Sequence, residues 1–265
     1  MAYLLLDENI SILFIPMDIL SEQDLSIFFQ NNQIFTSEFV KYISMCQSQK
    51  RRKELLLRSL LFLYIMQTNN VNIQYYNSIK RKEEILINNY FPSPAQTVYL
   101  SISHTDKWMV FALYSVSPIG IDIENSKRKT EKIKQFLNEK MLLDCLDEHP
   151  SVLLSLWTVY ESLYKLQSPL ENQKKVLNRV LSTIKKSHPQ KLNGFNLWNI
   201  PVYNYTTLIW EDEIAAVIGC FIIKGKMPKK IKFYSIEKLE NEIEKPCKIE
   251  LTRLLTCDMK LEINF

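Results

Sequence analysis

The stretch GIDIE at residues 120–124 places two carboxylates, Asp122 and Glu124, two residues apart in an apolar run. Isoleucine alternates with the acids, which is the pattern of a strand buried on one side. Successive side chains of a strand point to opposite faces, so both acids would project from the same face. The alternative is an ordinary half-exposed strand whose acids face water, and this stretch alone leaves both interpretations open.

A second stretch, WTVYESLYK at residues 157–165, has a helical pattern. Trp157, Glu161 and Lys165 stand four residues apart and would form one stripe of that helix. Three acids and a lysine brought together suit a hard divalent cation that is itself holding a phosphate. The alternative is a surface ion pair between Glu161 and Lys165, but Trp157 on the same stripe favours a face that contacts protein.

Composition narrows the class of protein. The 265 residues are 46% apolar and 23% charged, as in ordinary globular proteins, and suffice for one large domain or two small ones. A net charge of +4 does not suggest nucleic-acid binding. Only four glycines occur, which excludes a P-loop or a GxGxxG dinucleotide site, since both need clustered glycines.

The five cysteines lack CxxC spacing, which indicates reduced thiols in a cytoplasmic protein rather than disulfides or a zinc site. The N-terminal residues carry no basic leader, so a signal peptide is not expected. No uninterrupted apolar run reaches about 18 residues, so a membrane span is not expected either.

The hydrophobic pattern predicts an α+β fold. Helices are expected at residues 37–67, 131–136, 139–146 and 152–166, and strands at 98–103, 109–114, 119–124, 202–210, 214–223 and 231–234. Residues 171–191 are rich in Lys and Arg. The order strand, helix, strand pair occurs roughly twice, which predicts a pseudo-twofold pair of lobes, each a small, mainly antiparallel sheet packed with helices. The division is 1–117 for the N-terminal lobe, 118–240 for a C-terminal lobe carrying the metal site, and 241–265 for a C-terminal extension, with the active site in the cleft between the lobes.

Two further groups of residues are candidates for binding phosphate. Ser103 and His104 end the predicted strand at 98–103, where a histidine can donate to a phosphate or serve as a hydrogen-bonded structural residue. The run at residues 50–53 includes Lys50 and Arg51 and opens a helix, either as a phosphate anchor or as a solvated face. The same two interpretations apply to Lys82 in the basic run at 80–82.

Taken together, these stretches resemble the 4′-phosphopantetheinyl transferases, in particular the larger, monomeric type that activates surfactin synthetase. The shared pattern is a Ser-His strand end, then Gly-x-Asp-x-Glu, then Trp-x-x-x-Glu-x-x-x-Lys. The chain carries these motifs in that order at residues 103–104, 120–124 and 157–165, and LRSL at 57–60 and FYS at 233–235 also fit. The resemblance covers roughly residues 10 to 240.

The resemblance implies transfer of the 4′-phosphopantetheine arm of coenzyme A to a serine of an apo carrier protein (acyl, peptidyl or polyketide), with release of 3′,5′-ADP. Asp122, Glu124 and Glu161 would hold Mg²⁺, with Mn²⁺ as a substitute, against the coenzyme A pyrophosphate. Glu161 would take the proton of the carrier serine, directly or through water. Lys165 would stabilise the departing phosphate or relay the proton. Ser103 and His104 would contact coenzyme A phosphates.

The chain departs from the family in two places. Tyr160 stands directly before the motif glutamate, where the family usually has Lys, and no Gly-Lys-Pro precedes the Ser-His strand. Lys82, or its neighbour Lys80, would take the place of the lysine of that tripeptide. These departures support an alternative, a catalytically weakened relative that binds coenzyme A or a carrier protein without transfer. An unrelated Mg²⁺-dependent phosphohydrolase would explain the acids but not the other motifs.

The resemblance also implies a partner and a surface for it. The family receives acidic, helical carrier proteins on apolar surface just after the Gly-x-Asp-x-Glu strand, and the transferase itself is expected to be a monomer. The residues that could form this surface are Phe136, Leu137, Met141 and Leu142, with Lys132 and Lys134 as a basic rim. The alternative is that these apolar side chains belong to the core.

Overall fold

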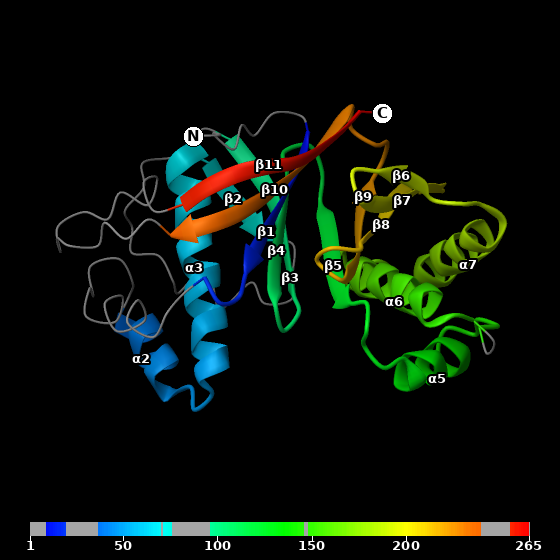
Figure 1. The fold of residues 1–265 in the computed structure, drawn as a ribbon, viewed down its shortest axis with the longest axis horizontal. Coiled ribbons are helices and arrows are strands. Elements are labelled where there is room, and N and C mark those ends of the chain that lie inside the picture. The colour runs from blue at the N-terminus through cyan, green and yellow to red at the C-terminus, as the bar shows by residue number, and fades with distance from the viewer. Residues whose placement is uncertain are drawn as a thin grey trace.

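The computed structural model describes residues 9–19, 37–69, 71–75, 96–145, 148–239 and 255–264, with side chains except at 37–39, 60–69, 71–75, 96–98, 236–239 and 255–264. Over these residues the fold is α+β, as predicted, with two mainly antiparallel sheets (Figure 1). The helices are α2 (Ser37–Met45), α3 (Gln49–Asn69), α5 (Glu131–Glu139), α6 (Pro150–Lys165) and α7 (Leu170–Lys186).

The first sheet has six strands in the order β11-β10-β1-β4-β3-β2. Their bounds are β1 (Ile10–Pro16), β2 (Val71–Tyr75), β3 (Gln96–His104), β4 (Trp108–Tyr114), β10 (Lys230–Leu239) and β11 (Leu255–Asn264). The second sheet has five strands, all antiparallel to their neighbours, in the order β5-β9-β8-β7-β6. Their bounds are β5 (Ile119–Asn125), β6 (Gln190–Leu192), β7 (Phe195–Val202), β8 (Tyr205–Asp212) and β9 (Val217–Lys224).

The chain passes from the six-stranded sheet to the five-stranded sheet between β4 and β5. It later returns, because β10 pairs in parallel with β1, so part of the segment 118–240 lies in the six-stranded sheet. The segment 241–265 contributes β11, which pairs with β10. The pseudo-twofold relation between lobes stays a prediction.

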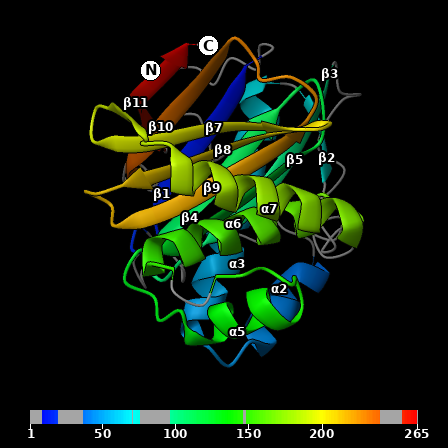
Figure 2. The same cartoon turned by 90° about the vertical axis from the view of Figure 1, so that its right-hand side faces the viewer.

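The two sheets share one apolar core, and helices lie outside them. Alternate residues of β1, β4, β5, β8 and β9 form a continuous cluster between the sheets that includes Phe14, Ile121, Trp210 and Phe221. Figure 1 shows α3 at the left of the sheets and α6 and α7 at the right. In Figure 2, α6 and α7 lie in front of the five-stranded sheet. The architecture is therefore helix, sheet, sheet, helix.

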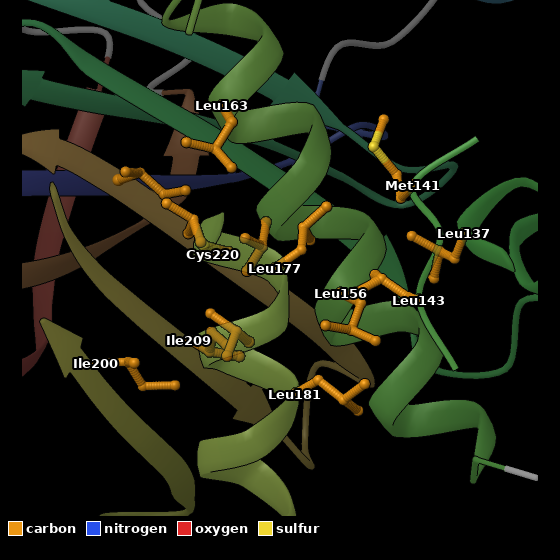
Figure 3. Packing of buried hydrophobic residues seen from close by; sticks show 14 of the residues in the cluster. Leu137, Met141, Leu143, Leu156, Leu163, Leu177, Leu181, Ile200, Ile209 and Cys220 are labelled. Carbon is orange, nitrogen blue, oxygen red and sulfur yellow. The ribbon is translucent and has the colours of Figure 1, made fainter. Parts of the chain in front are cut away.

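A second apolar cluster fixes α6 on the five-stranded sheet. Leu156 and Leu163 of α6 pack with Leu177 of α7 and with Ile209 and Cys220 of the sheet (Figure 3). All five side chains are at most 1% exposed. Burying a leucine of this kind stabilises the fold by about 1.5–3 kcal/mol, so the position of α6 relative to β5 is firmly held.

Gly120 lets α6 approach the start of β5. A Cβ atom at this position would lie 2.1 Å from the carbonyl oxygen of Ser162 on α6. Alternation along β5 puts Gly120, Asp122 and Glu124 on the same face, toward α6. The helix therefore crosses the strand at the glycine, and the two acids that follow extend beside the helix toward Glu161.

Serine hydroxyls join the two sheets at β3 and β5. Because β5 is an edge strand of its own sheet, its outward N–H groups need partners outside that sheet. The N–H of Ile121 donates to Ser101 Oγ at 3.0 Å, and the N–H of Ile123 donates to Ser103 Oγ at 3.3 Å. The alternation of serines in β3 thus supplies the acceptors that a neighbouring strand would provide.

Replacing Ser101 with alanine is expected to destabilise the protein by roughly 1–3 kcal/mol, because the buried N–H of Ile121 loses its acceptor. Urea unfolding measures the change. Ser155→Ala is the matched control, since among the described residues this buried hydroxyl bonds only the carbonyl of Ser151 one turn back in α6, and its loss should cost no more than about 1 kcal/mol. Equal urea midpoints for the two variants would show that the hydrogen bond from Ile121 to Ser101 does not stabilise the fold.

Several predicted elements are wrong in detail. No helix spans residues 139–146: α5 ends at Glu139, and Leu142 has a positive φ of 57°, which no helix accommodates. The Asn138 side chain then accepts from the N–H of Cys145 and holds this turn. The predicted strand at 202–210 is two strands, because a turn at Tyr203 and Asn204 separates β7 from β8.

Other elements lacked a prediction or begin later than predicted. Strand β9 begins at Val217 rather than at 214, because the side chain of Asp212 accepts from the N–H groups of Ile214 and Ala215 and fixes a turn there. Residues 171–191 hold helix α7. Strand β2 falls in a stretch with no predicted element. Among the described residues, no helix is both long and apolar enough to span a lipid bilayer.

Candidate active site

A cavity of about 480 Å³ opens between α3 and α6, at the joint of β3 and β5. Its walls come from both halves of the chain, and nearly all sequence-predicted residues meet there. The lining residues are Arg51, Glu54, Leu55, Arg58, Ile102, Ser103, His104, Met109, Asp122, Glu124, Arg128, Trp157, Glu161, Tyr164 and Lys165. The prediction that the two acids of β5 share a face with each other, and that Trp157, Glu161 and Lys165 form one stripe, is confirmed.

Asp122 lies at the bottom of a polar network. Ser103 Oγ donates to Asp122 Oδ1 at 2.7 Å, and Lys165 Nζ donates to the same oxygen at 2.8 Å. The lysine also donates to the carbonyl oxygen of Ile121 at 2.7 Å. The other carboxylate oxygen, Oδ2, is buried and has no hydrogen-bond partner among the described residues. That oxygen is therefore available to a cation.

Glu124 is held by two donors on a single oxygen. Trp157 Nε1 donates to Glu124 Oε1 at 3.1 Å, and the Arg128 guanidinium forms an ion pair with the same atom. Burial raises the pKa of Glu124 and the charge of Asp122 raises it further, while Arg128 and Trp157 oppose these effects. The indole of the sequence motif thus has a defined role, which is to orient this acid.

Glu161 forms no hydrogen bond or ion pair with any side chain that the structure describes, although it lines the cavity. Burial raises its pKa, and the negative charges of Asp122 and Glu124 raise it further, against the opposing effect of Lys165. The sequence alternative of a Glu161–Lys165 surface pair is wrong, because the lysine pairs with Asp122 instead. A carboxylate with a raised pKa and unoccupied oxygens is suited to accept a proton.

The opposite wall is formed by α3 and carries two arginines, Arg51 and Arg58, which stand seven residues apart on the helix. Arg51 NH1 donates to Glu54 Oε2 at 2.8 Å, and Arg58 is only 9% exposed. His104 lies beside them, with Nδ1 3.9 Å from Glu54 Oε1. Burial lowers the pKa of His104; the charge of Glu54 opposes this effect, while the charges of Arg51 and Lys165 add to it, and the net change is downward. The imidazole is therefore mostly neutral at neutral pH and has one N–H to donate.

The side chains of the cavity fit a divalent cation in chemistry. Oxygen ligands from Asp122, Glu124 and Glu161 are the type that Mg²⁺ takes, and the unpartnered Oδ2 of Asp122 is a ready donor. Burial is the main cause of the raised pKa values of both glutamates and neighbouring carboxylates add to it, and a bound cation would oppose both effects. Within the described part of the chain, however, no three His, Cys, Asp or Glu side chains are arranged so that they could hold a metal as they stand. Lys165 pairs with Asp122, and Arg128 pairs with Glu124.

Of the predicted coenzyme A contacts, Lys50 lies elsewhere, Ser103 lines the cavity in another role, and Lys82 lies outside the described residues. Lys50 lies away from the cavity, in an exposed ion pair with Asp106. Ser103 gives its hydroxyl proton to Asp122, which leaves it no donor for a phosphate, and its role is to position the acid. Lys82, with its neighbour Lys80, lies outside the described residues.

The predicted apolar patch after β5 divides between core and surface. Leu137 and Met141 are buried at 0% and 3% exposure, so the core interpretation is correct for them. Leu142 is 71% exposed, and Phe136 packs edge-on against Trp157 at 5.4 Å. Tyr160 joins that aromatic group, with its ring centroid 5.4 Å from that of Trp157.

A larger cavity, of about 620 Å³, lies between α7 and the turn from β7 to β8. It is lined mainly by polar and basic residues, among them Lys174, Lys175 and Arg179, and by none of the sequence-predicted site residues. Asp122, Glu124, Glu161 and Lys165 all line the smaller cavity, which is therefore the candidate active site.

Glu161→Gln is expected to raise the Tm at neutral pH without added divalent cations. The raised pKa means that ionised Glu161 destabilises the folded state, and that penalty is present above its pKa and disappears as the pH falls through it. The advantage of the variant, measured by thermal unfolding over a pH series, should therefore shrink at low pH. The control is Glu171→Gln: Lys175 lowers the pKa of exposed Glu171, so this change should not stabilise. A Tm gain for the control, or none for Glu161→Gln, would contradict the assignment.

The function of the chain must be inferred from this cavity. Its acids come from α3, β5 and α6, its lysine from α6, and its arginines from α3 and the loop after β5. No model of a known protein family matches the chain, and no characterised protein is significantly similar to it.

Proposed function

We propose that this chain is a Mg²⁺-dependent 4′-phosphopantetheinyl transferase that modifies a serine of an apo carrier protein. The observation that carries the proposal is the single cavity in which Asp122, Glu124 and Glu161 lie with Lys165, opposite two arginines of α3. The sequence motifs that resemble the family are thus the residues that line one cavity together.

The charge of the cavity supports a ligand that arrives with a cation. Four cationic side chains (Arg51, Arg58, Arg128, Lys165) and four acidic ones (Glu54, Asp122, Glu124, Glu161) line it. With His104 neutral, these charges cancel. A pyrophosphate would meet no net attraction there, and the three site acids would repel it. Bound Mg²⁺ would neutralise the acids and the pyrophosphate together.

In the proposed reaction the serine hydroxyl of the carrier attacks the phosphorus that bears the pantetheine arm. The bond from that phosphorus to the bridging oxygen breaks, and 3′,5′-ADP leaves with the negative charge. Glu161 accepts the serine proton, for which its raised pKa and unoccupied oxygens suit it. Lys165 would stabilise the leaving phosphate, and Ser103 would keep Asp122 oriented.

The phosphates of coenzyme A would bind to donors on the α3 side. Arg51 and Arg58 are placed there, and bidentate guanidinium groups suit phosphate oxygens. His104 would donate its single N–H. Partner docking is proposed near exposed Leu142, with Lys132 and Lys134 as basic neighbours for an acidic, helical carrier. The proposal includes a cytoplasmic location and a monomeric state.

The test is incubation of the full chain with coenzyme A, Mg²⁺ and a panel of apo carrier proteins from fatty-acid, peptide and polyketide systems. Intact mass spectrometry should show one carrier gaining a single phosphopantetheine group. No gain on any carrier would overturn the proposal. Calorimetric binding of coenzyme A without turnover and without Mg²⁺ dependence would instead favour the binding protein that is the alternative.

A further inference from the structure

Arg128 pairs with Glu124, one of the acids proposed to hold the divalent cation. Its guanidinium pairs with Glu124 Oε1, the same oxygen that accepts from Trp157 Nε1 at 3.1 Å. Its charged carbon also lies 5.9 Å from the centre of the Trp157 ring, within reach of a cation–π interaction. With two donors on one oxygen, that side of the Glu124 carboxylate is occupied.

The turn after β5 brings Arg128 back to the strand end. The N–H of Arg128 donates to the carbonyl oxygen of Asn125 at 2.9 Å, and the Asn125 side chain accepts from the N–H of Lys127 at 2.9 Å. Ser126 N–H donates to the carbonyl oxygen of Ala216, which ties the turn to the loop before β9. The backbone of the turn is thus fixed, and only the long side chain of Arg128 has to move for Glu124 to be released.

The side chain of Arg128 is suited to such a movement. It is 44% exposed, whereas Glu124 is 14% exposed, so the arginine approaches the acid from the solvent side. The guanidinium already contacts water, so its release from Glu124 does not require it to leave a buried site. A divalent cation with two or three carboxylate ligands can therefore displace the guanidinium into water.

We propose that Arg128 is a positioning residue that competes with the divalent cation for Glu124 and so sets the metal concentration at which the cavity is loaded. This inference rests on the proposed function, because it takes the acids of the cavity as metal ligands. Arg128 keeps Glu124 oriented and neutralised until the metal arrives with its phosphate ligand. Replacement of the arginine by a neutral side chain leaves the carboxylate uncompensated and open to the metal.

Mn²⁺ binding to the full chain tests this competition without coenzyme A or carrier. Electron paramagnetic resonance of free Mn²⁺ gives the dissociation constant for the wild type and for Arg128→Gln, Arg128→Lys and Lys127→Gln. Arg128→Gln should bind Mn²⁺ roughly tenfold more tightly. Arg128→Lys should stay near the wild type because it keeps the charge. Lys127→Gln removes an exposed neighbouring cation and should change little.

Unchanged or weaker Mn²⁺ binding in Arg128→Gln would overturn the inference, as would equal tightening in Lys127→Gln or a lack of Mn²⁺ binding in every protein. These outcomes are separate from the fate of the proposed function. If the chain binds Mn²⁺ as expected but modifies no carrier, the proposed transferase function is wrong and the competition at Glu124 still holds. If the chain modifies a carrier but its Mn²⁺ affinity does not change in Arg128→Gln, only the proposed competition is wrong.

Discussion

Glu161→Gln is expected to lower the rate of phosphopantetheine transfer by at least about a hundredfold, the usual contribution of a positioned general base. The amide cannot accept the serine proton, yet it has the shape of the carboxylate. The residue forms no hydrogen bond with the described side chains, so the fold should persist and even gain stability. The measurement is the initial rate of carrier mass gain at saturating coenzyme A.

The matched control for this variant is Glu171→Gln. Glu171 also stands four residues before a lysine on a helix, but it is exposed on α7 and pairs with Lys175 there. Its replacement should leave the transfer rate unchanged. Coenzyme A binding by Glu161→Gln, measured by calorimetry, should be retained, because the α3 arginines remain in place. An unchanged rate in Glu161→Gln would remove Glu161 from the chemistry.

Gly120→Ala is expected to destabilise the protein by about 1–3 kcal/mol and to abolish coenzyme A binding in the molecules that still fold. The new Cβ would meet the Ser162 carbonyl at 2.1 Å and the Leu166 side chain at 3.1 Å, so α6 must move away from β5. That movement separates Lys165 from Asp122 and Glu161 from Glu124. Urea unfolding and calorimetry measure the two effects.

Gly219→Ala separates the loss of stability from the loss of the site. Its Cβ would lie 2.2 Å from the Trp210 ring, in the core between the sheets, and so it creates a comparable clash away from α6. This variant should lose stability but bind coenzyme A with near wild-type affinity when folded. Similar loss of binding in both variants would show that the β5–α6 approach has no special role in the site.

Periodicity made part of this site predictable from sequence. Alternation in residues 119–124 places Asp122 and Glu124 on one face, and the four-residue spacing in α6 places Glu161 and Lys165 on one stripe. Such patterns report which side chains share a face of one element. They do not report which element packs against that face, so the pairing of Lys165 with Asp122 rather than Glu161 was not predicted.

The residues that were missed owe their roles to tertiary contacts. Arg128 lies in a turn with no periodic pattern, and hydrogen bonds to Asn125 and Ala216 hold the turn that brings it back to Glu124. Ser103 was predicted to contact phosphate, but its hydroxyl, on a strand of one sheet, donates to Asp122 on a strand of the other. Pairing of β10 with β1 joins residues more than two hundred positions apart, which local pattern does not encode.

Helix α7 is a different case, because a signal for it was present. Val176, Leu177, Val180 and Leu181 are all buried and repeat at helical spacing, and Pro169 stands at the N-terminal end of the helix. The many lysines of this segment indicate a charged surface and do not by themselves predict a helix. A stripe of apolar residues within a basic segment predicts an amphipathic helix.

The most direct test of the central claim follows both products of one reaction of the full chain with coenzyme A and a responsive apo carrier. With Mg²⁺ present, the account predicts one 3′,5′-ADP released for each phosphopantetheine group gained by the carrier. Neither product should form with EDTA or with a carrier whose acceptor serine is alanine, and both should form at least about a hundredfold more slowly with Glu161→Gln. Release of 3′,5′-ADP without modification of the carrier, or modification at the wild-type rate by Glu161→Gln, would contradict it.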